Sequence, residues 1–223
     1  MGLRVGTGVL LALVLNAAVL GAQDLRVTSY VSGLEQPVGL VADPSEPRRQ
    51  FVIEKVGRIR VVEQGVLQHD AALDLTTHVT AAGEQGLLGL AVDPSFDTTG
   101  RIWVNFTRQP DGATVIARFT RLPGAPLRFD PATRLDLQFS SQPSRRFIPQ
   151  PAANHNGGKL LFGIDRHLFI AMGDGGGSND THRTAQDPQQ LLGKILRLIG
   201  MRSWHRGPIP DVHGEQTARG GAA

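Results

Sequence analysis

The stretch GLVADP at residues 39–44 returns as GLAVDP at residues 89–94, 50 positions further along the chain. Each copy is followed by a loop and a second apolar run, residues 51–54 in the first case and 102–106 in the second. The repeated unit is therefore strand, Asp-Pro turn, strand. A repeat of this length that is built from short strands is typical of the blades of a β-propeller.

A third, degenerate copy of the unit covers residues 160–165 and continues with an apolar run at 168–172. Further strands are predicted at 58–62, 114–120 and 194–198. We therefore predict an all-β chain with about three propeller blades. A β-sandwich with similar turns is the alternative, which the 50-residue recurrence makes less favoured.

Helical periodicity is nearly missing beyond the N-terminal segment, and residues 187–192 are the one place where we predict a turn of helix. This pattern argues against an alternating strand and helix fold. The run GDGGG at residues 173–177 is therefore not interpreted as a dinucleotide loop. Gly193 and Lys194 lack the glycine spacing and the following Ser or Thr of a phosphate loop.

The composition is that of a soluble globular unit with a core of ordinary size. The chain has 223 residues, of which 40% are hydrophobic, and it contains no cysteine, so its stability does not depend on disulfides. The charge of +3 is spread without a basic run, which gives nucleic-acid binding no electrostatic footprint. Trp103 and Phe106 lie on an alternating strand and are expected in the core rather than under a bound sugar.

Residues 1–22 have the order of a secretory signal peptide. Arg4 is followed by the apolar residues 9–15 and then by small residues up to Gly21 and Ala22. The apolar part is too short for a stable membrane span, although an uncleaved anchor is an alternative. We expect export to the periplasm or beyond the cell, with no membrane span in the mature chain.

One histidine and one aspartate are placed for proton chemistry. His155 precedes the apolar run 159–162 and Asp174 follows the run 168–172, with turn-forming residues 163–167 between the runs. Two antiparallel strands joined there bring both side chains to the same end of a hairpin. A carboxylate beside an imidazole orients it and favours its charged form, which suits a general base. The alternative is that both residues only shape glycine-rich turns.

Four motifs follow one another in the chain, GEQGLLGLAVDPSF at 83–96, NHNGGKL at 154–160, MGDGGG at 172–177 and LLGKILRL at 191–198. In this order they resemble the glucose/sorbosone dehydrogenase family, the soluble quinoprotein aldose sugar dehydrogenases. The resemblance covers roughly residues 30–198, and the four ordered motifs are together far more specific than any one of them.

The resemblance implies a six-bladed β-propeller that uses pyrroloquinoline quinone (PQQ) and calcium to oxidise an aldose at its anomeric carbon to the lactone. The histidine that aligns with His155 is the general base in that family and takes the hydroxyl proton while hydride passes to the quinone. The aspartate that aligns with Asp174 supports this histidine. The sugar and the electron acceptor are left open.

Glu84 stands where many family members have a glutamine that touches the cofactor, so we predict it as a cofactor contact. A carboxylate there faces a cofactor that itself bears carboxylates, and a solvated loop acid is the alternative. Asn154 is predicted as a second cofactor contact. Both Asn154 and Asn156 are suited to orienting His155 or binding sugar hydroxyls, and equally to shaping a turn.

No residue is assigned to a metal from the sequence. Asp180, His182 and Asp187 follow the glycines in a polar segment, but they lack the regular ligand spacing of a calcium loop. A solvated loop is the favoured interpretation.

The resemblance stops near Leu198, and residues 199–223 have no strand periodicity. We expect three regions, a signal peptide at 1–22, a partial propeller domain at 23–198, and an irregular tail that reads as a truncated or frame-shifted end. The later blades of the family carry the calcium-binding carbonyls and the cationic side chains for the cofactor carboxylates. A non-catalytic extracellular propeller that binds a protein or a glycan is therefore the alternative function.

Overall fold

The structure is a computed structural model, and it describes residues 25–139, 141 and 144–198. The predicted signal peptide and tail lie outside these residues. Within them the chain is almost entirely β-structure, arranged as three antiparallel sheets that follow one another in sequence order.

The elements have the following bounds. The first sheet contains β1 (Pro37–Ala42), β2 (Arg49–Glu54), β3 (Arg58–Glu63) and β4 (Val66–Leu67), with β5 (Leu73–Asp74) paired to β3. The second contains β6 (Leu87–Val92), β7 (Arg101–Thr107), β8 (Thr114–Arg121) and β9 (Phe129–Asp136). The third contains β10 (Gly157–Phe162), β11 (Leu168–Met172) and β12 (Ile195–Arg197), and a short helix α1 (Phe96–Thr99) precedes β7.

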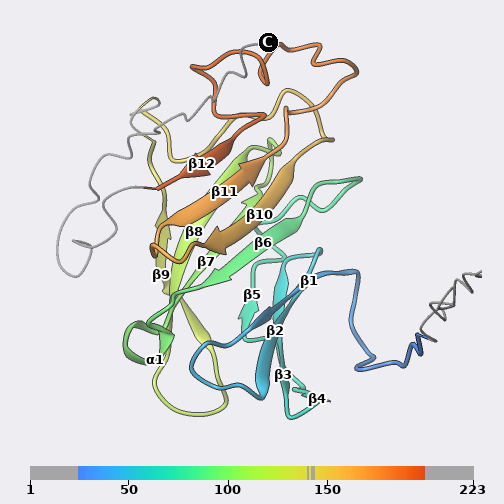
Figure 1. Ribbon diagram of the computed structural model, residues 1–223, viewed down its shortest axis with the longest axis vertical. Coiled ribbons are helices and arrows are strands. Elements are labelled where there is room, and N and C mark those ends of the chain that lie inside the picture. Colours follow the sequence, from blue (N-terminus) through green and yellow to red (C-terminus); the bar gives the residue numbers. More distant parts are fainter. Residues whose placement is uncertain (1–24, 140, 142–143, 199–223) are drawn as a thin grey trace, which may run out of the picture.

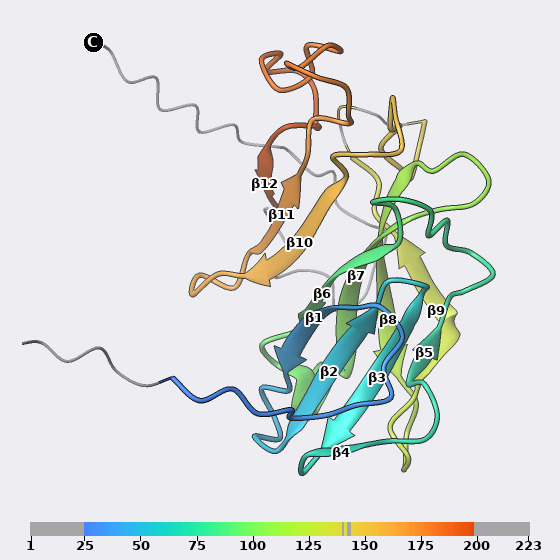
Figure 2. The same ribbon diagram turned by 90° about the vertical axis from the view of Figure 1, so that its right-hand side faces the viewer.

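The three sheets are arranged as successive blades. The second sheet lies between the other two in both views (Figures 1 and 2), and the first strand of each sheet, β1, β6 and β10, lies beside its counterpart in the next sheet. Each sheet meanders outward from that first strand. This is the architecture of a β-propeller, so the predicted fold class and the three blades are confirmed.

The sequence repeat is also a repeat of backbone detail. Each first strand carries one extra residue relative to its partner, between Pro37 and Gly39, between Leu87 and Gly89, and between Gly157 and Leu160. Such a bulge bends the strand and strengthens its twist. The blades therefore begin with the same local distortion, just where the chain enters the sheet.

The Asp-Pro turns of the first two copies are built alike. The backbone N–H of Ser45 donates to Asp43 Oδ1 at 2.8 Å, and that of Ser95 donates to Asp93 Oδ1 at 2.8 Å. Each aspartate thus closes the turn that ends the first strand of its blade, which is the physical reason for the repeated Asp-Pro pair.

The core fills the two seams between neighbouring blades. Phe51, Phe96 and Phe129 pack with ring centroids 5.9–6.2 Å apart between the first and second blades. Trp103 and Leu160 belong to a second cluster between the second and third blades. Alternate residues of β7 enter opposite clusters, because successive side chains of a strand point to opposite faces.

Trp103 is 1% exposed and Phe106 is fully buried, so their predicted place in the core is confirmed.

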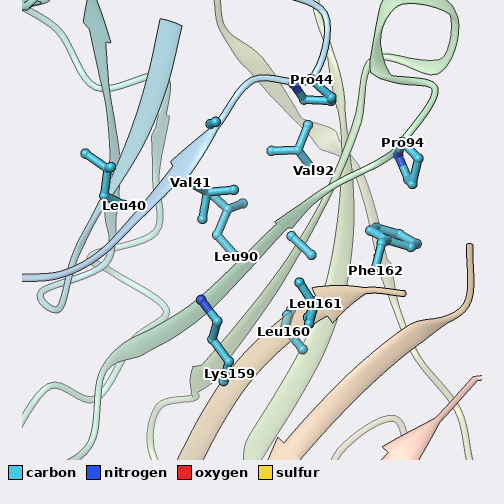
Figure 3. A pocket seen from close by; sticks show the side chains of 12 residues that line it. Leu40, Val41, Pro44, Leu90, Val92, Pro94, Lys159, Leu160, Leu161 and Phe162 are labelled. Atoms are coloured by element: carbon cyan, nitrogen blue, oxygen red, sulfur yellow. The ribbon is translucent and has the colours of Figure 1, made fainter. Parts of the chain in front are cut away.

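A shallow groove of about 390 Å³ runs where the three first strands converge. Figure 3 shows side chains of β1, β6 and β10 around it, Leu40 and Val41 from the first blade, Leu90 and Val92 from the second, and Leu160–Phe162 from the third. The groove lies toward the ends of these strands. The predicted site residues lie at the opposite ends, because Glu84 precedes β6, Asn154 and His155 precede β10, and Asp174 follows the neighbouring strand β11.

One local expectation needs correction, and some elements were not predicted. The helical turn predicted at 187–192 is absent, because Asp187 Oδ1 accepts the N–H of Gln189 at 2.9 Å and closes a turn instead. Helix α1 was not predicted. Strand β9 was missed as well, because Pro131 weakens its strand pattern, and a proline is tolerated there because β9 lies at the edge of its sheet.

No helix among the described residues is long and apolar enough to cross a membrane.

Candidate active site

His155 and Asp174 form a hydrogen-bonded pair at one end of the β10–β11 hairpin. Gly157 of β10 pairs with Met172 of β11, so the residue two before β10 lies beside the residue two after β11. His155 Nδ1 and Asp174 Oδ1 are 2.9 Å apart. The proximity predicted from the hairpin is confirmed, while the catalytic role of the pair stays a prediction.

The backbone of His155 is held from both sides. Its φ of 53° lies in the left-handed region, which residues with a side chain rarely adopt. Its N–H donates to Glu84 Oε2 at 2.6 Å, and its carbonyl accepts the N–H of Gly175 at 3.4 Å. Gly173 packs directly on this carbonyl, since a Cβ at position 173 would lie 1.8 Å from the oxygen. These contacts therefore fix the position of the His155 backbone, from which the imidazole side chain extends.

The Asp174 carboxylate has a lowered pKa. The main cause is the backbone N–H of Gly176, which donates to Oδ1 at 3.0 Å, and the contact with His155 adds to it. Asp174 is therefore ionised at neutral pH and acts as an acceptor for the N–H at His155 Nδ1. In the neutral imidazole this leaves Nε2 unprotonated, so Nε2 is the atom able to take up a proton.

The pair is open to a ligand. The His155 side chain is 44% exposed and that of Asp174 is 23% exposed. Behind them, the Thr184 hydroxyl donates to the backbone carbonyl of Asp174, which ties the aspartate to the loop that follows. The imidazole thus faces the outside while its partner is anchored in the loop structure.

The lowered pKa of Asp174 predicts a pH-dependent effect of Asp174→Asn on stability. A carboxylate with a depressed folded-state pKa stabilises the fold above its ordinary pKa, and this contribution is lost as pH falls through the folded value. We expect the stability gap between wild type and the variant to be largest near pH 6–7 and to shrink below about pH 4. Urea unfolding at pH 7, 5 and 3.5 measures it.

The control for this experiment is Asp97→Asn on α1, where the carboxylate accepts a bond from the neighbouring Thr98 hydroxyl at 3.1 Å. A gap for Asp174→Asn that stays constant from pH 7 to pH 3.5 would contradict the prediction.

Sequence reasoning considered Lys194 only as part of a rejected phosphate loop, whereas in the structure it organises the loop behind the site. Its Nζ donates to the carbonyls of Thr184, Ala185 and Leu192 at 2.8, 2.9 and 3.1 Å. The ammonium therefore closes the loop after the glycine run onto β12. In the sequence Lys194 is only the first residue of the predicted strand 194–198, which carries too little information to predict such a role.

The two asparagines beside His155 lie in different surroundings. Asn154 is half-buried, and its Oδ1 packs on Gly176, 2.3 Å from where a Cβ would be. Asn156 is only 2% exposed, and no protein group in the described part of the chain is hydrogen-bonded to its side-chain amide. Buried amides are normally paired, so the amide of Asn156 has hydrogen-bonding capacity available for a bound group or for water.

The acidic residues after the glycine run shape their own loop. Asp180 accepts the backbone N–H of Ala185 at 3.1 Å and the side-chain amide of Gln186 at 3.2 Å. Within residues 25–139, 141 and 144–198, no group of three or more His, Cys, Asp or Glu side chains is arranged to hold a metal ion.

The blades and the exposed His-Asp pair define a β-propeller protein with a polar site at one end of its first strands. The chain belongs to the Glucose / Sorbosone dehydrogenase family, whose model matches residues 34–208. The resemblance inferred from the four motifs is thereby confirmed.

Several known proteins are similar over part of their length. Aldose sugar dehydrogenase YliI of Escherichia coli K12 is 29% identical over 170 residues, which cover 72% of this chain and 41% of that protein. Human Hedgehog-interacting protein is 27% identical over 186 residues, which cover 77% of this chain and 25% of that protein. The chain thus spans less than half the length of these relatives.

The PQQ-bound aldose sugar dehydrogenase of Streptomyces coelicolor has a similar structure. It is 26% identical with a TM-score of 0.58, and the similarity covers 77% of this chain and 47% of that one. The fold of this chain is therefore similar to about half of that PQQ-bound structure.

Proposed function

We propose that this chain provides the proton-transfer half of a PQQ-dependent aldose dehydrogenase, with His155 as the general base and Asp174 as its orienting partner. The observation that carries the proposal is the exposed imidazole whose Nδ1 lies 2.9 Å from an ionised carboxylate. The family match and the PQQ-bound relative indicate the reaction class. The proposal applies to the partial propeller domain that we propose at residues 23–198.

The proposed chemistry at His155 follows from its hydrogen bonds. Nε2 takes the proton of the anomeric hydroxyl, and the positive charge that develops on the ring is stabilised by the Asp174 carboxylate. Asp174 stays ionised throughout because the N–H of Gly176 also donates to it. The left-handed backbone at His155 fixes the base before substrate binds.

The residues present are better suited to the quinone group of PQQ than to its carboxylates. When bound, PQQ supplies a quinone that accepts a hydride equivalent from the sugar carbon. The buried, unpaired amide of Asn156 and the half-buried Asn154 offer neutral donors beside the base, and we retain Asn154 and Glu84 as proposed cofactor contacts. The nearby Lys194 ammonium is taken up by three carbonyls, so it is not available for the cofactor carboxylates.

We include calcium in the proposal from the family resemblance and assign none of this chain's residues to it. The substrate is an aldose of unspecified identity, and the electron acceptor is left open. Export to the periplasm or the cell exterior is part of the proposal and rests on the signal-peptide pattern of residues 1–22.

A non-catalytic binding module is the second candidate. It is favoured by the similarity to Hedgehog-interacting protein, which is named for a protein partner. It is also favoured by the engagement of Lys194 with three backbone carbonyls, which leaves this cation unavailable to the cofactor carboxylates. Propellers serve many functions without chemistry, so the two candidates share one fold.

The deciding experiment is PQQ-dependent dye reduction with a panel of aldoses, run with calcium on this chain and on the E. coli relative. Saturable turnover that requires PQQ is the expected result. A chain that is folded by circular dichroism and still gives no turnover, under conditions where the relative is active, would favour the binding module.

A further inference from the structure

We propose that Glu84 is a positioning residue that clamps the backbone of His155 across the seam between the second and third blades. The inference rests on the proposed function for its purpose, since a positioned imidazole is useful only if it accepts a proton. The clamp itself is a structural claim, which is tested without any activity.

The evidence is one short hydrogen bond between distant parts of the chain. Glu84 lies three residues before β6, in the second blade, and His155 lies two residues before β10, in the third. Glu84 Oε2 accepts the His155 N–H at 2.6 Å across a separation of 71 residues. A hydrogen bond from a backbone N–H to an ionised carboxylate is shorter and stronger than one between neutral groups.

The bond acts where the backbone needs a constraint. With φ at 53°, His155 occupies a region that is narrow for a residue with a side chain, and a turn residue in this conformation persists when its surroundings hold it. Gly173 and Gly175 hold the carbonyl side of His155, and Glu84 holds the N–H side. Removing the acceptor therefore frees one side of the peptide and leaves the other fixed.

Glu84 and Asp174 bind different parts of His155. Asp174 acts on the ring through Nδ1 and sets its orientation, while Glu84 acts on the main chain and sets the position from which the ring extends. The residues come from different blades, so the location of the base depends on how the second and third blades pack. Glu84 is itself exposed, yet its carboxylate binds the His155 N–H and is not only solvated.

The test is amide hydrogen exchange of the full chain, labelled with ¹⁵N and followed by NMR, in wild type and in Glu84→Ala, Glu84→Gln and Asp174→Asn. We expect exchange at the His155 amide to be at least roughly tenfold faster in Glu84→Ala. Glu84→Gln keeps a neutral acceptor and is expected to fall between wild type and Glu84→Ala. Asp174→Asn is expected to alter the imidazole ¹⁵N shifts and to leave the His155 amide protected.

The matched control is Glu46→Ala, which removes another glutamate that accepts a backbone N–H, from Arg48 at 3.2 Å, within the first blade. It is expected to leave His155 exchange unchanged. Should Glu84→Ala not fold, Glu84→Gln decides the matter through faster exchange and an upfield shift of the His155 amide proton. Equal His155 exchange in wild type and in the folded Glu84 variants would overturn the proposal.

An activity readout separates this inference from the proposed function. If the chain turns over aldoses, Glu84→Ala is expected to lower kcat with rescue by Glu84→Gln. If the chain is inactive, the exchange data still decide whether the clamp exists. Loss of protection without turnover would support the clamp and count against the enzyme function.

Discussion

Gly89→Ala is expected to lower the free energy of unfolding by about 3 kcal/mol or more. A Cβ at position 89 would lie 1.9 Å from the carbonyl oxygen of Gly158 in the neighbouring blade. That oxygen belongs to the backbone of β10, so it moves only if the second and third blades separate. Separation would open the seam that buries Trp103 and Leu160.

The repeat provides a matched control in Gly39→Ala. Gly39 occupies the corresponding position after the bulge of β1, but a Cβ there meets the Cδ1 atom of Ile53 at 2.9 Å, which is the free end of a side chain. Rotation of Ile53 relieves this contact, so we expect a loss under about 1.5 kcal/mol. Urea unfolding at pH 7 measures both, and equal losses would show that the seam does not depend on the approach of Gly89 to Gly158.

His155→Gln is expected to reduce PQQ-dependent aldose oxidation by roughly 10²- to 10⁴-fold, the usual contribution of a general base. The reduction should appear in kcat, because the imidazole acts on the proton that leaves during the reaction and contributes little to holding the sugar. Glutamine keeps polarity at this position but lacks a basic ring nitrogen. Steady-state dye reduction over a range of sugar concentrations measures the effect.

Asp187→Asn is the control for this measurement. Asp187 lies in the loop after the glycine run and accepts the N–H of Gln189, a bond that an asparagine oxygen also accepts. We expect its turnover to match wild type. Turnover of His155→Gln within a few-fold of wild type, with unchanged stability, would remove His155 as the base.

Much of the fold was predictable because its signals are local. The repeated strand, Asp-Pro turn, strand unit located β1, β2, β6 and β7, and the Asx turns at Asp43 and Asp93 explain why the repeat survives in the sequence. Strand β9 was missed because its edge position, which makes a proline tolerable, is a property of the assembled sheet.

The contacts of the candidate site were likewise predictable only where they are local in the sequence. The pairing of His155 with Asp174 was predictable, because a short hairpin connects them and register follows from its turn. The backbone contact of Glu84 with His155 was not predictable, because it joins residues 71 positions apart through the packing of two blades. The commitment of Lys194 to three carbonyls depends likewise on the path of a loop.

By itself the sequence determined the all-β class, the blade repeat, the family and the hairpin that brings a histidine to an aspartate. Strand alternation, turn chemistry and short-range register are written in neighbouring residues, so they are legible without a structure. Only the tertiary structure decided which acid holds the His155 backbone and which glycine allows two blades to approach closely. It also decided that the Lys194 ammonium is hydrogen-bonded to three backbone carbonyls. These depend on distances between segments far apart in the chain, which packing alone sets.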